Sequence, residues 1–321
     1  MTHPLSTFLA LSVLVCALAL PASGAGFDFK DTKGDHLDVL FDGRIVARYM
    51  YAFDRSTPER FHETYKPYLH VFDAQGTAPI TKGPGGLYTH HRGIFCGWKI
   101  TVAGKTYDFW HIGQDLGYAR KVFDKPHFLM LHRQIAEQKA GTDGATLTAV
   151  IHWADPEGKP LVEETRTMAF AKPPAPALLQ VDFLTHLKAV AGDVQFGGDP
   201  EHAGVQYRPA DEVDRKKTKY VFPEGVADVR KEKDLPWAAV TYVLGPKTYS
   251  VLAMNHPDNP KGTVWSAYRD YGRFGAYPKF SVTKGGEQVL RYRFLVLEGD
   301  LPGREQLEKL SEAFAKASST K

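Results

Sequence analysis

The sequence predicts an all-β fold, an antiparallel β-sandwich followed by one C-terminal helix that begins at about residue 302. Apolar and polar residues alternate over most of the chain, which is typical of strands that bury one face. Short turns with Gly or Pro separate these runs, and the spacings leave little room for helical crossovers. With 321 residues, 43% of them hydrophobic, the chain can form a sizeable core. We expect a single domain over residues 26–321.

Residues 1–25 have a composition of their own and are predicted to be a secretory signal peptide. The run from Leu5 to Leu20 is almost wholly apolar, and small residues suited to a signal peptidase follow it up to Ala25. A membrane anchor is the alternative, but the run is shorter than the ~20 residues that span a bilayer. We expect a periplasmic or secreted protein with no membrane contact after cleavage. Its one remaining cysteine, Cys96, cannot form an internal disulfide.

Four pairs of alternating runs are predicted to form β-hairpins, because each pair flanks a short turn built on glycine. In chain order the hairpins span Leu37–Tyr51, Thr146–Phe170, Ala238–Met254 and Lys279–Leu297. The segment Pro173–Pro176 resembles a linker. It lies between two strand-like runs without a change of composition, so we interpret it as a loop within the domain.

One helix is predicted near the C-terminal end, over residues 306–316. Leu307, Leu310 and Phe314 fall on one face of it, and Pro302 lies just before its start, where a missing N–H costs little. We expect this helix to pack on the outside of a sheet.

The charge pattern and the absence of several motifs exclude some functions. Forty Lys and Arg residues against 37 Asp and Glu give a net charge of +3, with the signs interleaved, so no nucleic-acid partner is expected. The chain has no Gly-x-Gly-x-x-Gly fingerprint, Walker loop, Gly-x-Ser-x-Gly elbow or Cys-x-x-Cys pair. Nucleotide cofactors, serine hydrolase chemistry and structural zinc are therefore disfavoured. No cofactor is predicted, and the oligomeric state is left open.

The segment from Tyr88 to Arg92 holds the densest group of side chains that could take part in catalysis. On an extended chain adjacent residues point to opposite faces, so His90 would share a side with Arg92 while His91 takes the other. An imidazole beside a guanidinium suits proton transfer next to a developing anion. We predict His90 or His91 as general acid or base, Arg92 as a clamp and Tyr88 as a substrate contact. The alternative is a structural pair of loop histidines.

Two further groups are predicted to contact a substrate. Asp108, Trp110 and His111 end a strand-like run, where an indole ring and a carboxylate can bind the apolar face and the hydroxyls of a sugar. The alternative is a core tryptophan beside a solvated aspartate. Glu164 and Arg166 share one strand face, with an internal ion pair as the alternative.

A loop rich in proline follows the apolar strand that ends near Met254. Polar groups on a rigid loop at the end of a sheet are a usual place for binding or catalysis. The alternative is a loop tied by Asx-turn hydrogen bonds. The candidates are His256 as an opposing proton-transfer group, Arg269 as a clamp, and Asp258, Asn259, Trp265 and Tyr268 as substrate contacts.

Several of these motifs match one known family in order along the chain: Lys66–His70, Tyr88–Gly93, Trp98, Asp108–Trp110, Glu164 with Arg166, and His256–Pro260 with Trp265 and Arg269. Together they resemble the exported bacterial proteins labelled "methane oxygenase PmoA-like". The family's usual His-Pro-His-His-Arg stands here as Tyr88–Arg92, which weakens a site needing three histidines in that motif. Methane oxidation is not expected, because the mature chain has no apolar run long enough to cross a bilayer. The resemblance implies a galactose-mutarotase type of β-supersandwich. It also implies a gene neighbourhood that encodes polysaccharide-degrading enzymes.

The sequence thus predicts an exported carbohydrate-active enzyme, a lyase, hydrolase or epimerase that uses His and Arg in general acid/base chemistry. A non-catalytic carbohydrate-binding protein is the alternative. No metal is predicted, and activity is expected to survive chelation, because the opposed faces of His90 and His91 would let at most one of them join a cluster. A cluster of His91, His111 and His256 across neighbouring strands is the alternative.

Overall fold

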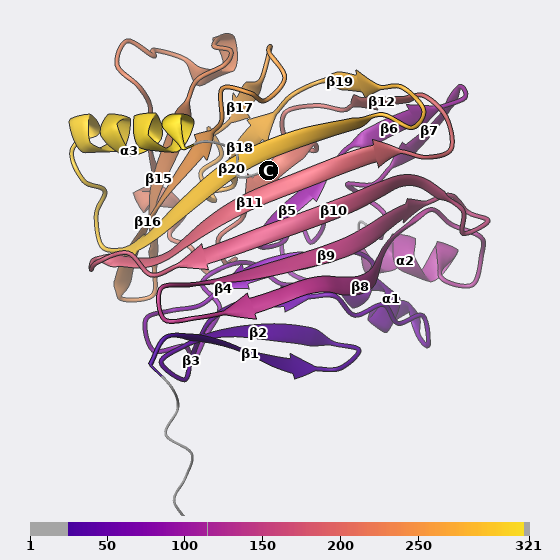
Figure 1. Cartoon of the computed structure of the whole chain (residues 1–321), viewed down its shortest axis with the longest axis horizontal. Coiled ribbons are helices and arrows are strands. Elements are labelled where there is room, and N and C mark those ends of the chain that lie inside the picture. Colours follow the sequence, from indigo (N-terminus) through magenta and orange to yellow (C-terminus); the bar gives the residue numbers. More distant parts are fainter. Residues whose placement is uncertain (1–24, 114, 318–321) are drawn as a thin grey trace, which may run out of the picture.

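The computed structural model describes residues 25–113 and 115–317 and confirms the predicted antiparallel β-sandwich with a C-terminal helix (Figure 1). Of the predicted signal peptide, only Ala25 belongs to the described residues. Two eight-stranded sheets and one four-stranded sheet make up the fold. We call them sheets 1, 2 and 3.

Neighbouring strands pair antiparallel in all three sheets. In spatial order, sheet 1 comprises β1 (Phe27–Thr32), β2 (His36–Phe41), β3 (Arg44–Met50), β4 (Tyr68–Val71), β5 (Ile94–Gly97), β13 (Gly204–Tyr207), β18 (Phe274–Tyr277) and β17 (Val264–Ser266). Sheet 2 comprises β14 (Lys219–Val221), β15 (Trp237–Leu244), β16 (Lys247–Asn255), β20 (Glu287–Glu298), β11 (Ala177–Ala189), β10 (Pro160–Ala171), β9 (Gly144–Ala154) and β8 (Leu129–Ala140). Sheet 3 comprises β19 (Phe280–Val282), β12 (Val194–Gly197), β6 (Lys99–Val102) and β7 (Lys105–Asp108).

Three of the four predicted hairpins are confirmed. β2 pairs with β3, β9 with β10, and β15 with β16. Asp42 and Gly43, between β2 and β3, have φ angles of 50° and 75°, as a two-residue hairpin turn requires. The fourth hairpin is wrong, because β19 pairs with β12 whereas β20 lies between β11 and β16. The twelve-residue β20 is a central strand, and the three-residue β19 is too short to cover it.

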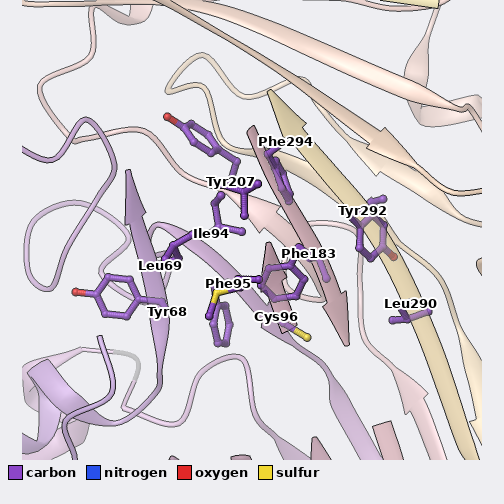
Figure 2. Packing of buried hydrophobic residues seen from close by; sticks show 14 of the residues in the cluster. Tyr68, Leu69, Ile94, Phe95, Cys96, Phe183, Tyr207, Leu290, Tyr292 and Phe294 are labelled. Carbon is purple, nitrogen blue, oxygen red and sulfur yellow. The ribbon is translucent and has the colours of Figure 1, made fainter. Parts of the chain in front are cut away.

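The main core lies between sheets 1 and 2. Figure 2 shows Cys96 and Tyr207 of sheet 1 among the buried residues that also include Phe183 and Phe294 of sheet 2. The Tyr207 hydroxyl lies 2.6 Å from that of Tyr242 in β15, a hydrogen bond that joins the two sheets. Cys96 is a buried free thiol.

The strands β5 and β13 also present a second surface, which we call the outer face of sheet 1. Because Cys96 and Tyr207 point into the core, alternation directs Phe95 and Gln206 away from sheet 2. These two residues are opposite each other in the antiparallel register. Both are buried, since loops cover this face. Those loops carry the candidate site.

Glu164 and Arg166, predicted as substrate contacts, instead form the internal ion pair that was the alternative. Arg166 donates to both Glu164 oxygens over 2.7 and 3.0 Å, and its third nitrogen donates to the Pro67 carbonyl oxygen over 3.2 Å. Glu164 also accepts from Trp153 Nε1–H at 2.9 Å and from the Thr185 hydroxyl at 3.0 Å. A fully buried charge pair needs such partners to offset its desolvation. The pair therefore braces the core, and no substrate reaches it.

The predicted C-terminal helix is confirmed as α3 (Arg304–Lys316). Its buried residues Leu307 and Phe314 pack with Trp237 and Leu252 of sheet 2 in a cluster separate from the main core. Helix α3 thus covers part of the face of sheet 2 that points away from sheet 1, which we call the outer face of sheet 2 (Figure 1).

Four short helical segments were not predicted. They occur in loops between strands, where the apolar periodicity is too short to indicate a helix. They are α1 (Pro58–Thr64), α2 (Leu116–Val122) and the 3₁₀ turns η1 (Arg215–Lys217) and η2 (Val229–Lys231). Within the described ranges, no helix combines the length and apolar character needed to cross a membrane.

Candidate functional site

Four histidines gather over the outer face of sheet 1, although they come from three loops far apart in the sequence. His90 and His91 precede β5, His111 follows β7, and His202 precedes β13. Ring centroids lie 4.3 Å apart for His90 and His91, 4.6 Å for His90 and His111, and 4.7 Å for His111 and His202. His91 and His202 stack at 5.5 Å. We call these four residues the histidine cluster.

The turn before β5 explains why both of its histidines reach the cluster. Tyr88 has a φ of 51°, and the His91 N–H donates to the Tyr88 carbonyl oxygen over 2.9 Å. The segment is therefore a turn and not an extended strand. The prediction that His90 and His91 point to opposite faces is wrong, and so is the prediction that at most one of them joins a cluster.

An aspartate three residues earlier in the chain orients each of the other two rings. The Nδ1–H of His111 donates to Asp108, and that of His202 donates to Asp199, each over 3.0 Å. Each aspartate also accepts the backbone N–H of its own histidine, which closes a tight local turn. An ionised carboxylate only accepts hydrogen bonds, so Nδ1 donates a proton to it and Nε2 is the ring nitrogen that remains for another partner. Within the described ranges, neither Nε2 has a protein hydrogen-bond partner.

His90 and His91 each carry a buried ring nitrogen without a partner. His90 Nε2 and His91 Nδ1 make no hydrogen bond to any described residue, and His91 is only 2% exposed. Burial, together with the nearby His111, lowers the pKa of His90 to about 2. Burial and the charge of Arg273 hold the pKa of His91 well below its usual value. Both imidazoles are therefore neutral at neutral pH and unsuited to the predicted role of general acid, which must carry a proton.

A buried lysine and a tryptophan form the floor of the cluster. Lys66 Nζ–H donates to the carbonyl oxygens of His90 and Trp110, and Nζ lies 3.7 Å from the centroid of the Phe95 ring. The Trp110 ring packs on that of His91 at 5.7 Å. Lys66 thus ties two of the loops to each other above sheet 1. The indole of Trp110 is buried, so it supports the cluster and is not the open sugar platform that the sequence predicts.

The carboxylate of Glu201, which precedes His202, contacts the charged and polar side chains beside the cluster. It accepts from Arg269 at 2.6 Å and from the Tyr268 hydroxyl at 3.0 Å, and Arg273 lies 3.6 Å away. Burial favours a higher pKa for Glu201, but the bonds from Arg269 and Tyr268 and the charge of Arg273 outweigh it and lower the pKa. Tyr268 and Arg269, both predicted site residues, are therefore brought to the site by Glu201.

An open groove runs beside Glu201. Its lining includes aromatic rings and charged groups, and two of the rings, Tyr220 and Phe222, lie nearly parallel at 6.4 Å. The groove is lined by Glu201, Tyr220, Phe222, Asp228, Arg230, Tyr268 and Arg269, among others. Such a lining can hold a ligand that has both apolar faces and hydroxyl groups.

Tyr88 borders the cluster from the solvent side. Its side chain is 45% exposed, and its ring lies 6.4 Å from those of both His90 and His91. The Tyr271 ring packs against it at 5.1 Å. Tyr88 is thus placed where a substrate contact would require it.

Arg92 holds its loop in place and does not face a ligand. It is fully buried, stacks on the Tyr65 ring at 4.3 Å, and donates to the carbonyl oxygens of His62 and Glu63 at the C-terminal end of α1. A helix end leaves such carbonyls unpaired, so the guanidinium satisfies them. The predicted role of Arg92 as an anion clamp is therefore wrong.

His256 lies on the outer face of sheet 2, away from the histidine cluster. Its ring packs edge-on against Phe314 of α3 at 5.3 Å and accepts the Asp258 N–H at 3.2 Å. Asn259 is buried and donates to the Asn255 side chain over 2.7 Å. The sandwich separates this loop from the cluster, so the predicted roles of His256, Asp258 and Asn259 at one common site are wrong. The loop is tied by local hydrogen bonds, as the alternative holds.

Trp265, another predicted substrate contact, is a core residue. It is buried in β17, and its Nε1–H donates to the Leu235 carbonyl oxygen over 3.0 Å. It therefore offers no stacking surface to a ligand.

The residues of the site that were not predicted from the sequence include His202, Asp199, Glu201 and Arg273. The spacing Asp-x-x-His occurs at residues 108–111, 124–127 and 199–202 and could have nominated His202. The same spacing would also have nominated His127, which instead hydrogen-bonds to the Ile112 carbonyl oxygen.

The fold is similar to several solved structures at low sequence identity. One is a mutant of the heparan sulfate lyase HepC from Pedobacter heparinus, with 11% identity and a TM-score of 0.42 over 85% of this chain and 37% of that chain. Another is the galactose 1-epimerase from Lactobacillus acidophilus NCFM, with 9% identity and a TM-score of 0.35 over 85% of this chain and 94% of that chain. The Slr1438 protein from Synechocystis sp. PCC 6803 has 11% identity and a TM-score of 0.40 over 85% and 96%.

The chain spans about a third of the length of HepC, and the same holds for a kojibiose phosphorylase and for heparinase III. At these scores no activity is transferred from those proteins to this chain. No curated protein matches the chain.

A family model described as "Family of unknown function (DUF6807)" matches residues 36–312, and the chain belongs to this family. The resemblance to proteins labelled "methane oxygenase PmoA-like" is therefore wrong as a family assignment, because the model that matches most of the chain is a different one.

Proposed function

We propose that this member of the DUF6807 family is an exported carbohydrate-active enzyme whose reacting centre is the histidine cluster. A lyase, a hydrolase and an epimerase each move a proton at a carbon or at a glycosidic oxygen. The proposal covers these three reaction types. The apolar run from Leu5 to Leu20, with small residues after it, supports export.

One observation carries the proposal: the histidine cluster and the open groove are joined by two consecutive residues. His202 belongs to the histidine cluster, and its neighbour Glu201 lines the groove. A ligand whose hydroxyls contact Glu201 would therefore have its adjoining atoms next to the imidazoles. This adjacency in the chain favours a reacting centre over two unrelated features.

The lining of the groove favours a carbohydrate as the ligand. Tyr220, Phe222 and Tyr268 offer rings on which the apolar face of a sugar can lie. Glu201 offers acceptor oxygens and Arg269 offers donors, which suits a molecule whose hydroxyls do both. Arg269 is 48% exposed, so it can exchange part of its bonding for a ligand.

A substrate screen with matched variants tests the proposal. The untagged protein is incubated with a panel of glycans and oxidised glycosides, and products are detected by mass spectrometry. We expect turnover of at least one carbohydrate and a loss of about 10²-fold in His202→Ala. His186→Ala is the control and should keep its activity, because this half-exposed histidine of β11 lies in sheet 2.

Binding calorimetry on the same panel separates the alternative function. Glycan binding without turnover across the panel would contradict the enzyme and favour a non-catalytic carbohydrate-binding protein. The aromatic groove supports binding in either case, whereas a loss of turnover specific to His202→Ala is expected only for the enzyme.

A further inference from the structure

We propose that the histidine cluster is a metal site in which His90, His91 and His202 bind one divalent transition-metal ion, with His111 next to it. This inference deepens the proposed function, on which it rests only for the role of the metal in turnover. It replaces the sequence-based expectation of no metal, which depended on His90 and His91 pointing to opposite faces.

The separation of the ring nitrogens supports a single shared ion. One nitrogen from each of His90, His91 and His202 lies within 4.8 Å of the other two. A point therefore exists within about 2.8 Å of all three, against roughly 2.0–2.1 Å for a zinc–imidazole bond. Side-chain movements of less than about 1 Å would complete such bonds. His111 lies at the same cluster, with ring centroids 4.6 Å from His90 and 4.7 Å from His202.

Buried nitrogens without partners point to a missing ligand. His90 Nε2 and His91 Nδ1 are both buried, and neither has a hydrogen-bond partner among the described residues. A buried polar atom without a partner loses its hydrogen bonds to water and gains none in return, so native proteins rarely keep two such atoms side by side. A metal ion in the cluster would use both lone pairs.

The two aspartates complete the arrangement that metal-binding histidines usually have. Asp108 and Asp199 each accept the Nδ1–H of one histidine, at 3.0 Å, which fixes the ring and leaves its Nε2 without a carboxylate partner. Their two negative charges also compensate the charge of a divalent ion.

The ligand set indicates the class of metal. All of its atoms are imidazole nitrogens, and no cysteine lies in the cluster. Imidazole ligands suit zinc, copper, iron and nickel, whereas calcium and magnesium prefer oxygen. An ion held by three histidines would keep an open position toward the solvent-facing side, where Tyr88 stands. At that position the ion would polarise an oxygen of a carbohydrate or activate a water molecule.

Metal titration tests this inference without any substrate. Untagged, chelator-treated protein is titrated with ZnCl₂ in a calorimeter, and with CoCl₂ while the visible absorption of Co²⁺ is recorded. We expect one ion per chain. His91→Ala and His202→Ala should bind at least about 100-fold more weakly, and Asp199→Asn should bind about 10–100-fold more weakly. His186→Ala is the matched control and should bind like the wild type.

Circular dichroism melting of each variant shows whether it is folded, and Asp199→Asn, which keeps every imidazole, still tests the site if His91→Ala does not fold. No zinc binding by the wild type, or equal affinity in His202→Ala, Asp199→Asn and His186→Ala, would overturn the inference. Stoichiometric binding without turnover of any carbohydrate would support the metal site and contradict the proposed function. Turnover by protein that binds no metal would support the proposed function and contradict the metal site.

Discussion

The outer faces of sheets 1 and 2 carry similar residues but differ in what surrounds them. On sheet 1 three loops bring four imidazoles together, and two of these rings have a supporting aspartate. On the outer face of sheet 2 the imidazole of His256 also has an aspartate close by, with Asp258 at 3.5 Å. There the ring packs under Phe314, and helix α3 covers the surface.

The neighbours of a histidine thus decide its role. On sheet 1 the nitrogens of one ring face those of the others, so a shared ligand can join them. On sheet 2 the ring of His256 faces an aromatic side chain, and its Nδ1 accepts a backbone N–H from the next turn. The first face is arranged for chemistry and the second for packing. The following predictions test this difference, from the largest expected effect to the smallest.

Phe314→Ala should affect stability and leave turnover unchanged. Phe314 is buried against sheet 2 and contacts His256 and the Arg293 guanidinium, so its removal should lower the free energy of unfolding by about 3–5 kcal/mol. Urea denaturation measures this loss. Turnover assayed well below the melting temperature should stay within about twofold of the wild type. A large loss of turnover in the folded variant would show that the outer face of sheet 2 takes part in function.

His90→Ala and His91→Ala should each lower kcat/KM by about 10² or more, whereas His256→Ala should leave it nearly unchanged. The sequence motifs group these three histidines, and the structure separates them. Each variant is assayed on a substrate identified in the screen, after circular dichroism has shown that it is folded. Equal losses in all three would restore the sequence-based grouping and contradict the separation of the two faces.

Acid should destabilise the protein through a buried histidine of sheet 1 that lies outside the cluster. Burial, helped by the charges of Arg48 and Arg92, lowers the pKa of His70 to about 3. The unfolded chain has a pKa near 6.5 at this residue, so below that pH it binds a proton that the folded chain does not. The contribution of the neutral His70 to the free energy of unfolding is therefore complete above pH 6.5. It is lost as the pH falls towards 3, by roughly 1.4 kcal/mol per pH unit for this one group.

The measurement is urea denaturation of the wild type and of His70→Gln at pH 7, 6 and 5. The variant should lose less stability between pH 6 and pH 5 than the wild type does. Parallel curves would show that His70 does not contribute to acid sensitivity.

The sequence predicted the sandwich well because its evidence is local. Asp42-Gly43 determines a turn, and the alternating residues beside it determine which side of β2 and β3 faces the core. The failed hairpin, β19 with β20, is a case in which the turn is local but the partner is not. Strand β20 pairs with β11, more than 90 residues earlier in the chain. The residues near β20 in the sequence do not indicate this partner.

The site was only partly predictable for a related reason. His90, His91, His111, Tyr88 and Arg269 were found because their motifs are dense in reactive side chains. His202 stands beside Asp199 and Glu201 in a short loop, but the same Asp-x-x-His spacing occurs at His127 outside the site, and only the pairing of β13 with β5 brings His202 to the cluster. The burial of Arg92 could not be inferred either, because it depends on α1, which is too short to show an apolar periodicity.

The smallest effect that still distinguishes the two faces is expected from two partly exposed ion pairs. Arg269 pairs with Glu201 beside the cluster, and Arg293 pairs with Asp182 on the α3 side. Exposed ion pairs contribute about 0–1 kcal/mol to stability, so Arg269→Gln should change the free energy of unfolding by no more than about that amount. Because Arg269 lines the groove, the same change should raise KM several-fold with a smaller effect on kcat. Arg293→Gln is the control and should leave KM unchanged, since Arg293 lies over Phe314. An equal rise of KM in both variants would mean that the arginines act through the overall charge of the protein and not through contact in the groove.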